Sequence, residues 1–338
     1  MGIQVKSTRI DSSKRKKLQE IIPIPTPMLL LIEPTNCCNQ RCKFCPTSNP
    51  ELLAGVGRKL NSFPKHFIKE LAAQLKEFPQ KIKKIHLYKD GEPLLYSELG
   101  NMISELKNAD VADEILLKTN GVLMSPQKNS MLIDSGLDWL GISVAAVDEK
   151  KYRELTGITI DYSDYTANIK DFYERKRNCH LYIKLANISL TQTEISSFYD
   201  IFQPISDSCA IENLHGWTGN EGRQFQLSQA EDSFNGIEVQ PKLVCPYPFY
   251  ALAINANCDV SICCNDWAHR TVVGNIMQER LIDIWNGERL RNFRLMHLKG
   301  MRCNNPACVD CSCLELLPDN IDMYRTEIIN RLSGGRNG

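Results

Sequence analysis

Three cysteines lie close together just after the first apolar segment of the chain. Cys38, Cys42 and Cys45 have the spacing C-x3-C-x2-C, so three thiolates from one short loop can face a single point. A structural zinc site takes four protein ligands. Cysteine thiolates also hold iron–sulfur clusters, and three ligands on a cubane leave its fourth iron open. The spacing therefore predicts a four-iron cluster whose open iron is the reaction site.

Most of the other cysteines stand in the C-terminal third of the chain. Of the 14 cysteines, only Cys179 and Cys209 lie outside the two groups at 37–45 and 245–313. Clustered cysteines in a reducing compartment indicate metal binding rather than disulfides. The two isolated cysteines are expected to be small buried hydrophobic residues.

Composition excludes several classes of partner. The 338 residues carry 40 Lys and Arg against 40 Asp and Glu, so charge does not favour nucleic acid or an anionic membrane. The basic run Lys14–Lys17 has no interleaved aromatic residues and is expected to be a solvated N-terminal segment. No apolar stretch approaches the roughly 18 residues of a membrane helix, and no signal sequence is visible. A cytoplasmic protein is therefore expected.

The first two thirds of the chain alternate short apolar runs with helical patterns. Strands are expected at 28–33, 84–89, 114–119, 139–144, 180–188 and 209–214, and helices at 64–78, 97–107, 126–135, 162–175 and 194–202. Six such units predict an α/β fold with a parallel sheet, in the form of a partial (β/α)6 TIM-type barrel, because a complete barrel needs eight. The loops after the first three strands are expected to converge on one face.

The cysteine loop, with Asn36 before it, Phe44 inside it and Pro46 after it, resembles the signature of the radical S-adenosylmethionine (SAM) superfamily. The segment 90–93, Asp-Gly-Glu-Pro, stands where that family has Gly-Gly-Glu-Pro. Asp90 replaces the first glycine, and we expect it there because Asp tolerates left-handed backbone better than most residues. The resemblance covers nearly the whole chain.

The resemblance implies a cofactor and a set of residues for it. Cys38, Cys42 and Cys45 are then the ligands of a [4Fe-4S] cluster, while Cys37 offers an alternative register and is expected not to bind. In this family an external donor such as flavodoxin or ferredoxin reduces the cluster. The reduced cluster then cleaves SAM to a 5′-deoxyadenosyl radical. The residues implied to contact SAM are Gly91 and Glu92 at the methionyl amine, Phe44 beside the adenine, and Ser143 and Asn187 at the ribose. Ser143 and Asn187 remain open to an ordinary strand-end role.

The C-terminal cysteines resemble the SPASM or shorter twitch extension of these enzymes. The ending C-x4-C-x2-C-x-C differs from the ladder of the two-cluster extension, so one auxiliary [4Fe-4S] cluster is expected. Its predicted ligands are Cys245, Cys263, Cys308 and Cys311, with Cys303 and Cys313 in reserve. Cys258 occupies the place of a usual glycine, and Cys264 has no assigned role. A four-thiolate zinc site remains the alternative, since spacing does not distinguish the two.

The expected domains follow from these patterns. A basic N-terminal segment (1–24) precedes the partial barrel (25–216), a bridging linker (217–244) and the small cysteine-rich SPASM/twitch domain (245–316). A hairpin with its turn near 255–259 is expected in that domain. The last part (317–338) is expected to hold one helix over 318–332 and a frayed end.

The most specific expectation is an oxidoreductase that removes hydrogen from substrate and passes an electron to the auxiliary cluster. A small alcohol, sugar or aminocyclitol is the preferred substrate, a ribosomal peptide the alternative, and a non-catalytic electron-transfer protein a third hypothesis. Substrate groups are expected on the loops after strands four to six, including Lys184, His215 and Trp217. Nucleic-acid and membrane partners are not expected.

Overall fold

Six parallel strands form the centre of the structure. The computed structural model describes residues 16–214, 216–225, 239–309, 311 and 313–334. The strands are β1 (Leu29–Ile32), β2 (Ile82–His86), β3 (Ala112–Thr119), β4 (Trp139–Val144), β5 (His180–Ala186) and β6 (Ser208–Glu212). Each pairs in parallel with the next along the chain. The predicted α/β fold with six parallel strands is confirmed.

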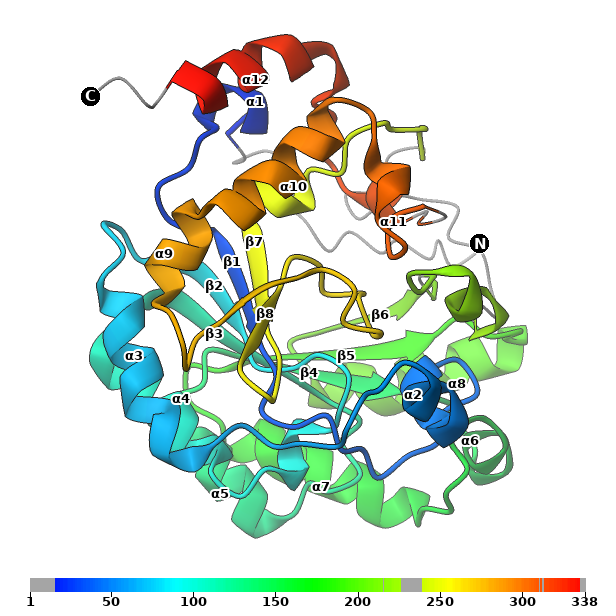
Figure 1. Ribbon diagram of the computed structural model, residues 1–338. Coiled ribbons are helices and arrows are strands. Elements are labelled where there is room, and N and C mark those ends of the chain that lie inside the picture. Colours follow the sequence, from blue (N-terminus) through cyan, green and yellow to red (C-terminus); the bar gives the residue numbers. More distant parts are fainter. Residues whose placement is uncertain (1–15, 215, 226–238, 310, 312, 335–338) are drawn as a thin grey trace.

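Helices cover one face of this sheet (Figure 1). They are α3 (Ile68–Lys76), α4 (Leu99–Ala109), α5 (Pro126–Asp134), α7 (Tyr162–Arg175) and α8 (Gln192–Phe202), as the periodicity predicts. Local capping fixes their starts: Ser125 accepts from Lys128 N before α5, and Thr191 and Glu194 form a capping box on α8. Two short helices, α2 (Pro50–Gly55) and α6 (Glu149–Thr156), were not predicted. Both are short, with six and eight residues, so each offers about two turns of pattern or fewer.

The two faces of the sheet differ in chemistry. Leu30, Ile85, Leu140 and Ile183 are buried against the helices, which gives the main hydrophobic core. The other face carries polar side chains, among them Lys118, Ser143, Lys184 and Glu212. Because side chains alternate along a strand, each strand gives one face to the core and one to the barrel interior.

The C-terminal module continues the barrel sheet. Strand β7 (Ala251–Ile254) pairs in parallel with β1, and β8 (Asp259–Ser261) and β9 (Val272–Asn275) follow antiparallel. The described strands thus form one sheet in the order β6-β5-β4-β3-β2-β1-β7-β8-β9. The hairpin is where the sequence predicts it, but its pairing with the barrel was not predicted.

Cys258 lies in the turn of that hairpin, and its backbone conformation explains why related sequences have glycine there. Its φ is 69°, in the left-handed region that favours glycine, and its side chain is buried in the core. The glycine of related sequences therefore has a conformational reason, and Cys258 takes the same conformation with a thiol directed into the core rather than toward a metal.

Helices of the two chain ends pack together above the sheet (Figure 1). Leu18 of α1 (Leu18–Ile21) and Ile328 of α12 (Arg325–Gly334) belong to one buried cluster with Leu298 of α10 (Glu288–Leu298). Two further helices are α9 (Leu281–Asn286) and α11 (Cys313–Leu316). The basic residues 14 and 15 lie outside the described part of the chain.

The predicted tail helix starts later than expected. Residues 318–321 are not helical, and Asp322–Tyr324 form a 3-10 turn before α12. The cause is Asp322, whose carboxylate accepts the backbone N–H groups of Leu243 and Val244, both at 2.9 Å. Asn320 also caps Asp322 N at 3.0 Å, which favours a turn over a helix.

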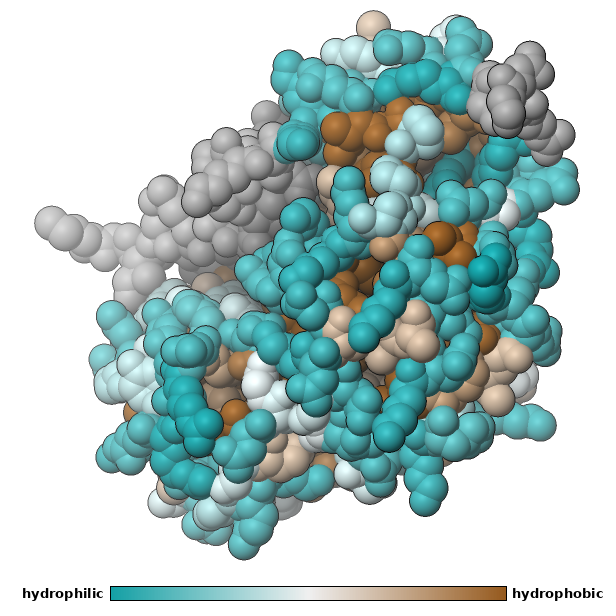
Figure 2. Space-filling model, turned by 90° about the vertical axis from the view of Figure 1, so that its left-hand side faces the viewer, coloured by the Kyte–Doolittle hydropathy of each residue, from teal (hydrophilic) through white to brown (hydrophobic). Residues whose placement is uncertain are grey.

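The face of the molecule shown in Figure 2 is mainly hydrophilic. On the face shown in Figure 2, hydrophobic residues appear between hydrophilic ones, mostly in the upper half, and form no broad apolar patch. Among the helices that the structure describes, none has the length and apolar character needed to cross a membrane.

Candidate functional site

The first cysteine loop follows β1 and is anchored before its first predicted ligand. The side chain of Asn36 accepts from Asn61 N at 2.7 Å and donates to Lys59 O at 3.0 Å. On the other side, Arg41 N donates to Thr156 O at 2.7 Å, at the end of α6. The loop is therefore held just before Cys38 and again between Cys38 and Cys42, which preorganises its thiols.

The three predicted cluster ligands are buried thiols that influence one another. Burial raises the pKa of Cys38 and Cys42, and raises that of Cys45 to about 11. The neighbouring thiols Cys45 and Cys38 add to the effect at Cys42. A thiol must lose its proton to bind a metal, so these thiolates need a strong local positive charge. The trio fits a [4Fe-4S] cluster, whose irons supply that charge.

Gly91 allows the next segment to pass against the cysteine loop. A Cβ atom at this position would lie 2.7 Å from Cys37 O and 2.8 Å from Asn36 C, and closer still to Thr35 O. Glu92 N donates to Cys37 O at 2.8 Å, which fixes the approach. Only glycine fits here, because the neighbours are backbone atoms that cannot move aside.

Glu92 is a buried carboxylate without an ion-pair partner among the described residues. Its Oε1 accepts from Thr119 Oγ1 at 2.6 Å and Leu94 N at 2.9 Å, and its Oε2 accepts from Asn120 N at 2.8 Å. A carboxylate offers about four lone-pair sites, so Oε2 keeps one. Burial raises the pKa of Glu92, and its charge raises the pKa of Cys38. An ammonium beside Cys38 fits both the open lone pair and the uncompensated charge.

The loops after the first three strands meet as predicted. Asn120 Nδ2, after β3, donates to Asn39 Oδ1 in the cysteine loop at 2.7 Å. Glu92, after β2, contacts the residues that end β3. The carboxyl ends of parallel strands lie at one edge, so residues distant in sequence build one site there.

Replacing Glu92 with Gln is expected to weaken SAM binding about 10- to 100-fold, because a hydrogen bond to a charged group contributes about 1.5–3 kcal/mol. The dissociation constant of SAM, measured by equilibrium dialysis on the reconstituted protein, checks this. Glu114→Gln is the matched control, since Glu114 is exposed and pairs with Lys84 at 2.9 Å. Equal SAM affinity in the two variants contradicts the assigned role.

The prediction for Asp90 is wrong in its reason. Asp90 is absent from the residues with positive φ among those the structure describes. Its side chain instead lies fully buried between Lys89, at 2.6 Å, and Arg58, at 2.9 Å. Aspartate is therefore present for its charge. The prediction considered only the backbone conformation at this position and missed that role.

The other residues predicted to contact SAM lie near this edge, and their roles stay predictions. Phe44 packs on the core, and its backbone O accepts from Trp217 Nε1 at 2.8 Å. Ser143 is next to the end of β4. Asn187 follows β5, and its side chain donates to Asn213 Oδ1 at 2.7 Å. His215, a predicted substrate residue, lies outside the described residues.

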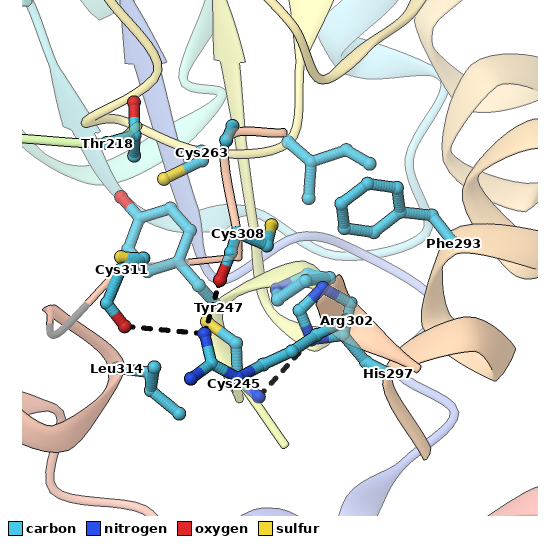
Figure 3. Close-up of a pocket in the computed structure, with 13 residues that line it drawn as sticks. Thr218, Cys245, Tyr247, Cys263, Phe293, His297, Arg302, Cys308, Cys311 and Leu314 are labelled. Atoms are coloured by element: carbon cyan, nitrogen blue, oxygen red, sulfur yellow. Dashed lines mark hydrogen bonds between the residues drawn. The ribbon is translucent and has the colours of Figure 1, made fainter. Parts of the chain in front are cut away.

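A second site forms in the C-terminal module. All four predicted auxiliary ligands, Cys245, Cys263, Cys308 and Cys311, line one pocket (Figure 3). The ligands come from three separate segments, before η6 (Tyr247–Phe249), after β8 and before α11. The set fits one auxiliary cluster with four thiolates.

The pocket also brings in two residues that sequence reasoning missed. Arg302 donates to the backbone O atoms of Cys308 and of Cys311, the latter at 3.4 Å. Cys245 N donates to His297 Nδ1 at 3.4 Å (Figure 3). Burial lowers the pKa of His297 to about 4, so its ring is neutral at pH 7. The adjacency of Arg302 to Cys303 was the only sequence signal for it.

The reserve cysteines are not among the residues that line the pocket. Cys303 is exposed, and Cys313 is buried with its thiol donating to Gly216 O at 2.9 Å and accepting from Asn265 Nδ2 at 2.8 Å. Hydrogen bonding to Cys313 lowers the pKa of Cys311 to about 7. The thiol of Cys313 thus lies beside that of a predicted ligand, and its place as a reserve ligand stays a prediction.

The zinc alternative lacks a prearranged site. In the part of the chain that the structure describes, no three His, Cys, Asp or Glu side chains come together around a single metal ion. Zinc requires four ligands about 2.0–2.3 Å from one ion. A four-iron cluster binds each cysteine at a different iron, so it does not require the thiols to surround a single ion.

Comparison with protein families gives the class. A model of the radical SAM superfamily matches residues 32–191, and a model of an iron–sulfur cluster-binding domain, SPASM, matches residues 245–312. The chain belongs to the radical SAM superfamily. Its C-terminal part is a SPASM domain, so the cofactors are SAM, a SAM-binding [4Fe-4S] cluster and an auxiliary iron–sulfur cluster.

Sequence relatives are named for a cyclase. The chain is 26% identical over 231 residues to GTP 3′,8-cyclase of Staphylococcus epidermidis, covering 63% of this chain and 64% of that protein. It is 29% identical over 181 residues to a probable GTP 3′,8-cyclase of Metallosphaera sedula (54% and 52%) and 42% identical over 156 residues to one of Methanopyrus kandleri (45% and 48%). The matches thus span about half to two thirds of these relatives.

Solved structures share the fold. SuiB of Streptococcus suis with S-adenosylmethionine aligns with TM-score 0.59 at 17% identity, over 88% of this chain and 74% of SuiB. The structure of anSMEcpe with AdoMet aligns with TM-score 0.58 at 14% identity, over 92% of this chain and 98% of that one. BtrN with AdoMet and 2-DOIA aligns with TM-score 0.53 at 17% identity, over 84% of this chain and 92% of BtrN. At these identities the likeness shows the fold alone.

Proposed function

We propose that this radical SAM enzyme is an oxidoreductase that dehydrogenates a small hydroxylated molecule, a sugar, polyol or aminocyclitol. The observation that carries the proposal is the convergence of Cys245, Cys263, Cys308 and Cys311 on one pocket. Four thiolates on four irons leave no iron open to substrate. An auxiliary cluster of that kind is suited to accept an electron rather than to bind the reactant.

When bound, SAM and the two clusters would supply hydrogen-atom abstraction from an alcohol carbon and an acceptor for the electron that remains once the hydroxyl proton is released to solvent. The chain's own residues position the reactants. Cys38, Cys42 and Cys45 hold the first cluster, and Glu92 binds the methionyl ammonium. Gly91 keeps the two loops in contact.

The barrel interior supports a polar substrate. Tyr182 OH donates to Glu212 Oε1 at 2.7 Å, and Lys184 Nζ lies 3.1 Å from Glu212 Oε2. On the other side His86 Nδ1 and Tyr88 OH are 3.0 Å apart, with Lys118 over the Tyr88 ring at 4.8 Å. These groups suit hydroxyl and amino substituents, and the relatives named for GTP also point to small molecules. A ribosomal peptide is the alternative, in line with the SuiB–SuiA complex among the structural neighbours.

The test is anaerobic turnover with SAM, reduced flavodoxin and a panel of polyols, sugars and aminocyclitols. We expect one 5′-deoxyadenosine for each ketone formed. Peptide oxidation in the absence of any small-molecule turnover supports the alternative. A reconstituted protein that makes no 5′-deoxyadenosine under any condition is an electron-transfer protein instead.

Changing Cys308 and Cys311 together to alanine is expected to separate the two halves of the reaction. The variant loses the auxiliary cluster, so its iron content falls from about eight to about four per chain. SAM cleavage continues, while the rate of ketone formation drops below a hundredth of the wild-type rate. Cys303→Ala, which changes an exposed thiol outside the pocket, is the control and should keep both. Ketone formation at the normal rate in the double variant contradicts the role of the cluster as electron acceptor.

A further inference from the structure

Four charged side chains are buried where the barrel meets the SPASM domain. The side chains of Glu33, Lys89 and Asp90 have 0% exposure and that of Arg58 has 5%. Two cations face two carboxyl groups, and burial raises the pKa of one of these, Glu33. They come from the end of β1, the segment after the cysteine loop and the loop after β2.

Asp90 is the centre of this group. Its Oδ2 lies 2.6 Å from Lys89 Nζ and 2.9 Å from Arg58 Nη1, while its backbone N donates to Glu33 Oε1 at 3.1 Å. Burial alone raises the pKa of a carboxyl, but Lys89 and Arg58 outweigh it and hold the pKa of Asp90 below its usual range. Asp90 is therefore ionised in a region without water access.

The same cations reach into the SPASM domain. Arg58 Nη1 donates to Trp267 O at 2.7 Å, and Lys89 Nζ donates to Asp266 O at 3.2 Å. Glu33 Oε2 accepts from Ala256 N at 3.0 Å. Ala256 precedes Cys263 in the sequence, and Asp266 and Trp267 follow it. The network therefore contacts the segment that carries this predicted auxiliary ligand on both sides.

On its other side the network reaches the SAM cluster. Cys45 Sγ lies 3.0 Å from Thr47 Oγ1, which donates to Asp90 O at 3.2 Å. A continuous set of polar contacts thus runs from a ligand of the first cluster, through Asp90, to the loop of the second.

A network of this type contributes little net stability. The desolvation of buried charges offsets most of their mutual attraction, and apolar replacements often do as well. Directional hydrogen bonds to Asp266 O and Trp267 O define a geometry that apolar contacts cannot.

We infer that Arg58, Lys89 and Asp90 are positioning residues that fix the placement of the auxiliary cluster relative to the SAM cluster. The inference requires the two clusters but no substrate. Its test can therefore fail or succeed independently of the proposed dehydrogenation.

The test is pulsed EPR of the holoprotein with both clusters reduced, where the magnetic coupling between the clusters reports their separation and orientation. Arg58→Met removes the bonds to Asp90 and Trp267 O but keeps the Lys89–Asp90 pair, so the chain should still fold. We expect at least a twofold broader distribution of the coupling, with unchanged iron content. Arg58→Lys keeps the charge, so its coupling distribution should be narrower than that of Arg58→Met but wider than that of the wild type.

Lys176→Met is the matched control. It removes a partly buried ion pair, Lys176–Asp207 at 2.8 Å, that lies between α7 and β6, far from both clusters. Its coupling should equal that of the wild type. An unchanged coupling in Arg58→Met overturns the inference.

A second measurement covers the case in which Arg58→Met loses a cluster. Hydrogen exchange of residues 266–271 is compared in the cluster-free variant and the cluster-free wild type. We expect at least tenfold faster exchange in this loop and no change in β4 and β5. Equal exchange in the loop overturns the inference as well.

Discussion

Changing Cys38, Cys42 and Cys45 together to alanine should abolish the formation of 5′-deoxyadenosine and leave about four of about eight iron atoms per chain. The three thiols share one loop, which is anchored at Asn36 and at Arg41. Iron and sulfide analysis and anaerobic SAM cleavage give the result. The auxiliary cluster should keep its absorption, because its pocket draws on other segments.

Cys37→Ala is the control for the triple variant. The backbone O of Cys37 accepts from Glu92 N at 2.8 Å. Alanine keeps this hydrogen bond, because it changes only the side chain. Normal iron content and SAM cleavage are expected. SAM cleavage that persists in the triple variant refutes the assignment of the reaction site.

Gly91→Ala should have a comparably large effect from a single methyl group. The added Cβ meets backbone atoms of Thr35, Asn36 and Cys37, so the loop after β2 must move away from the cysteine loop. Overpacking of this kind costs about 1–3 kcal/mol or more. The displacement also carries Glu92 out of place, so SAM binding should fall below detection in equilibrium dialysis while the thermal midpoint drops.

Gly55→Ala serves as the comparison, since a Cβ there has nothing within 4 Å. It should bind SAM normally and be as stable as the wild type or slightly more so. SAM affinity within twofold of the wild type in Gly91→Ala contradicts the close approach of the two loops.

The sequence predicts those parts of the site that depend on local pattern. Periodicity located the six strands, and spacing selected four cysteines that share one pocket. The helix α6 escaped because only Tyr152, Leu155 and Thr156 of its eight residues are buried. Eight residues give only about two turns of helical pattern, which is short for recognition.

The rest depends on contacts between distant segments. Nothing around Arg58 or Lys89 in sequence shows that both reach the backbone of residues 266–267, because the sheet order decides this. Asp90 was explained by backbone tolerance, whereas its charge compensates two buried cations. The pairing of β7 with β1 likewise leaves no local signal, since both are short apolar runs.

That pairing determines what can be removed from the protein. β1 has hydrogen-bonded neighbours on both sides, β2 on one and β7 on the other. A barrel cut off before residue 245 would present Leu29–Ile32 as an open edge of four aliphatic residues, which is the type of edge that promotes aggregation. The SPASM domain thus acts as an edge cap for the barrel, and a minimal SAM-cleaving fragment would have to replace that cap before it could stay in solution.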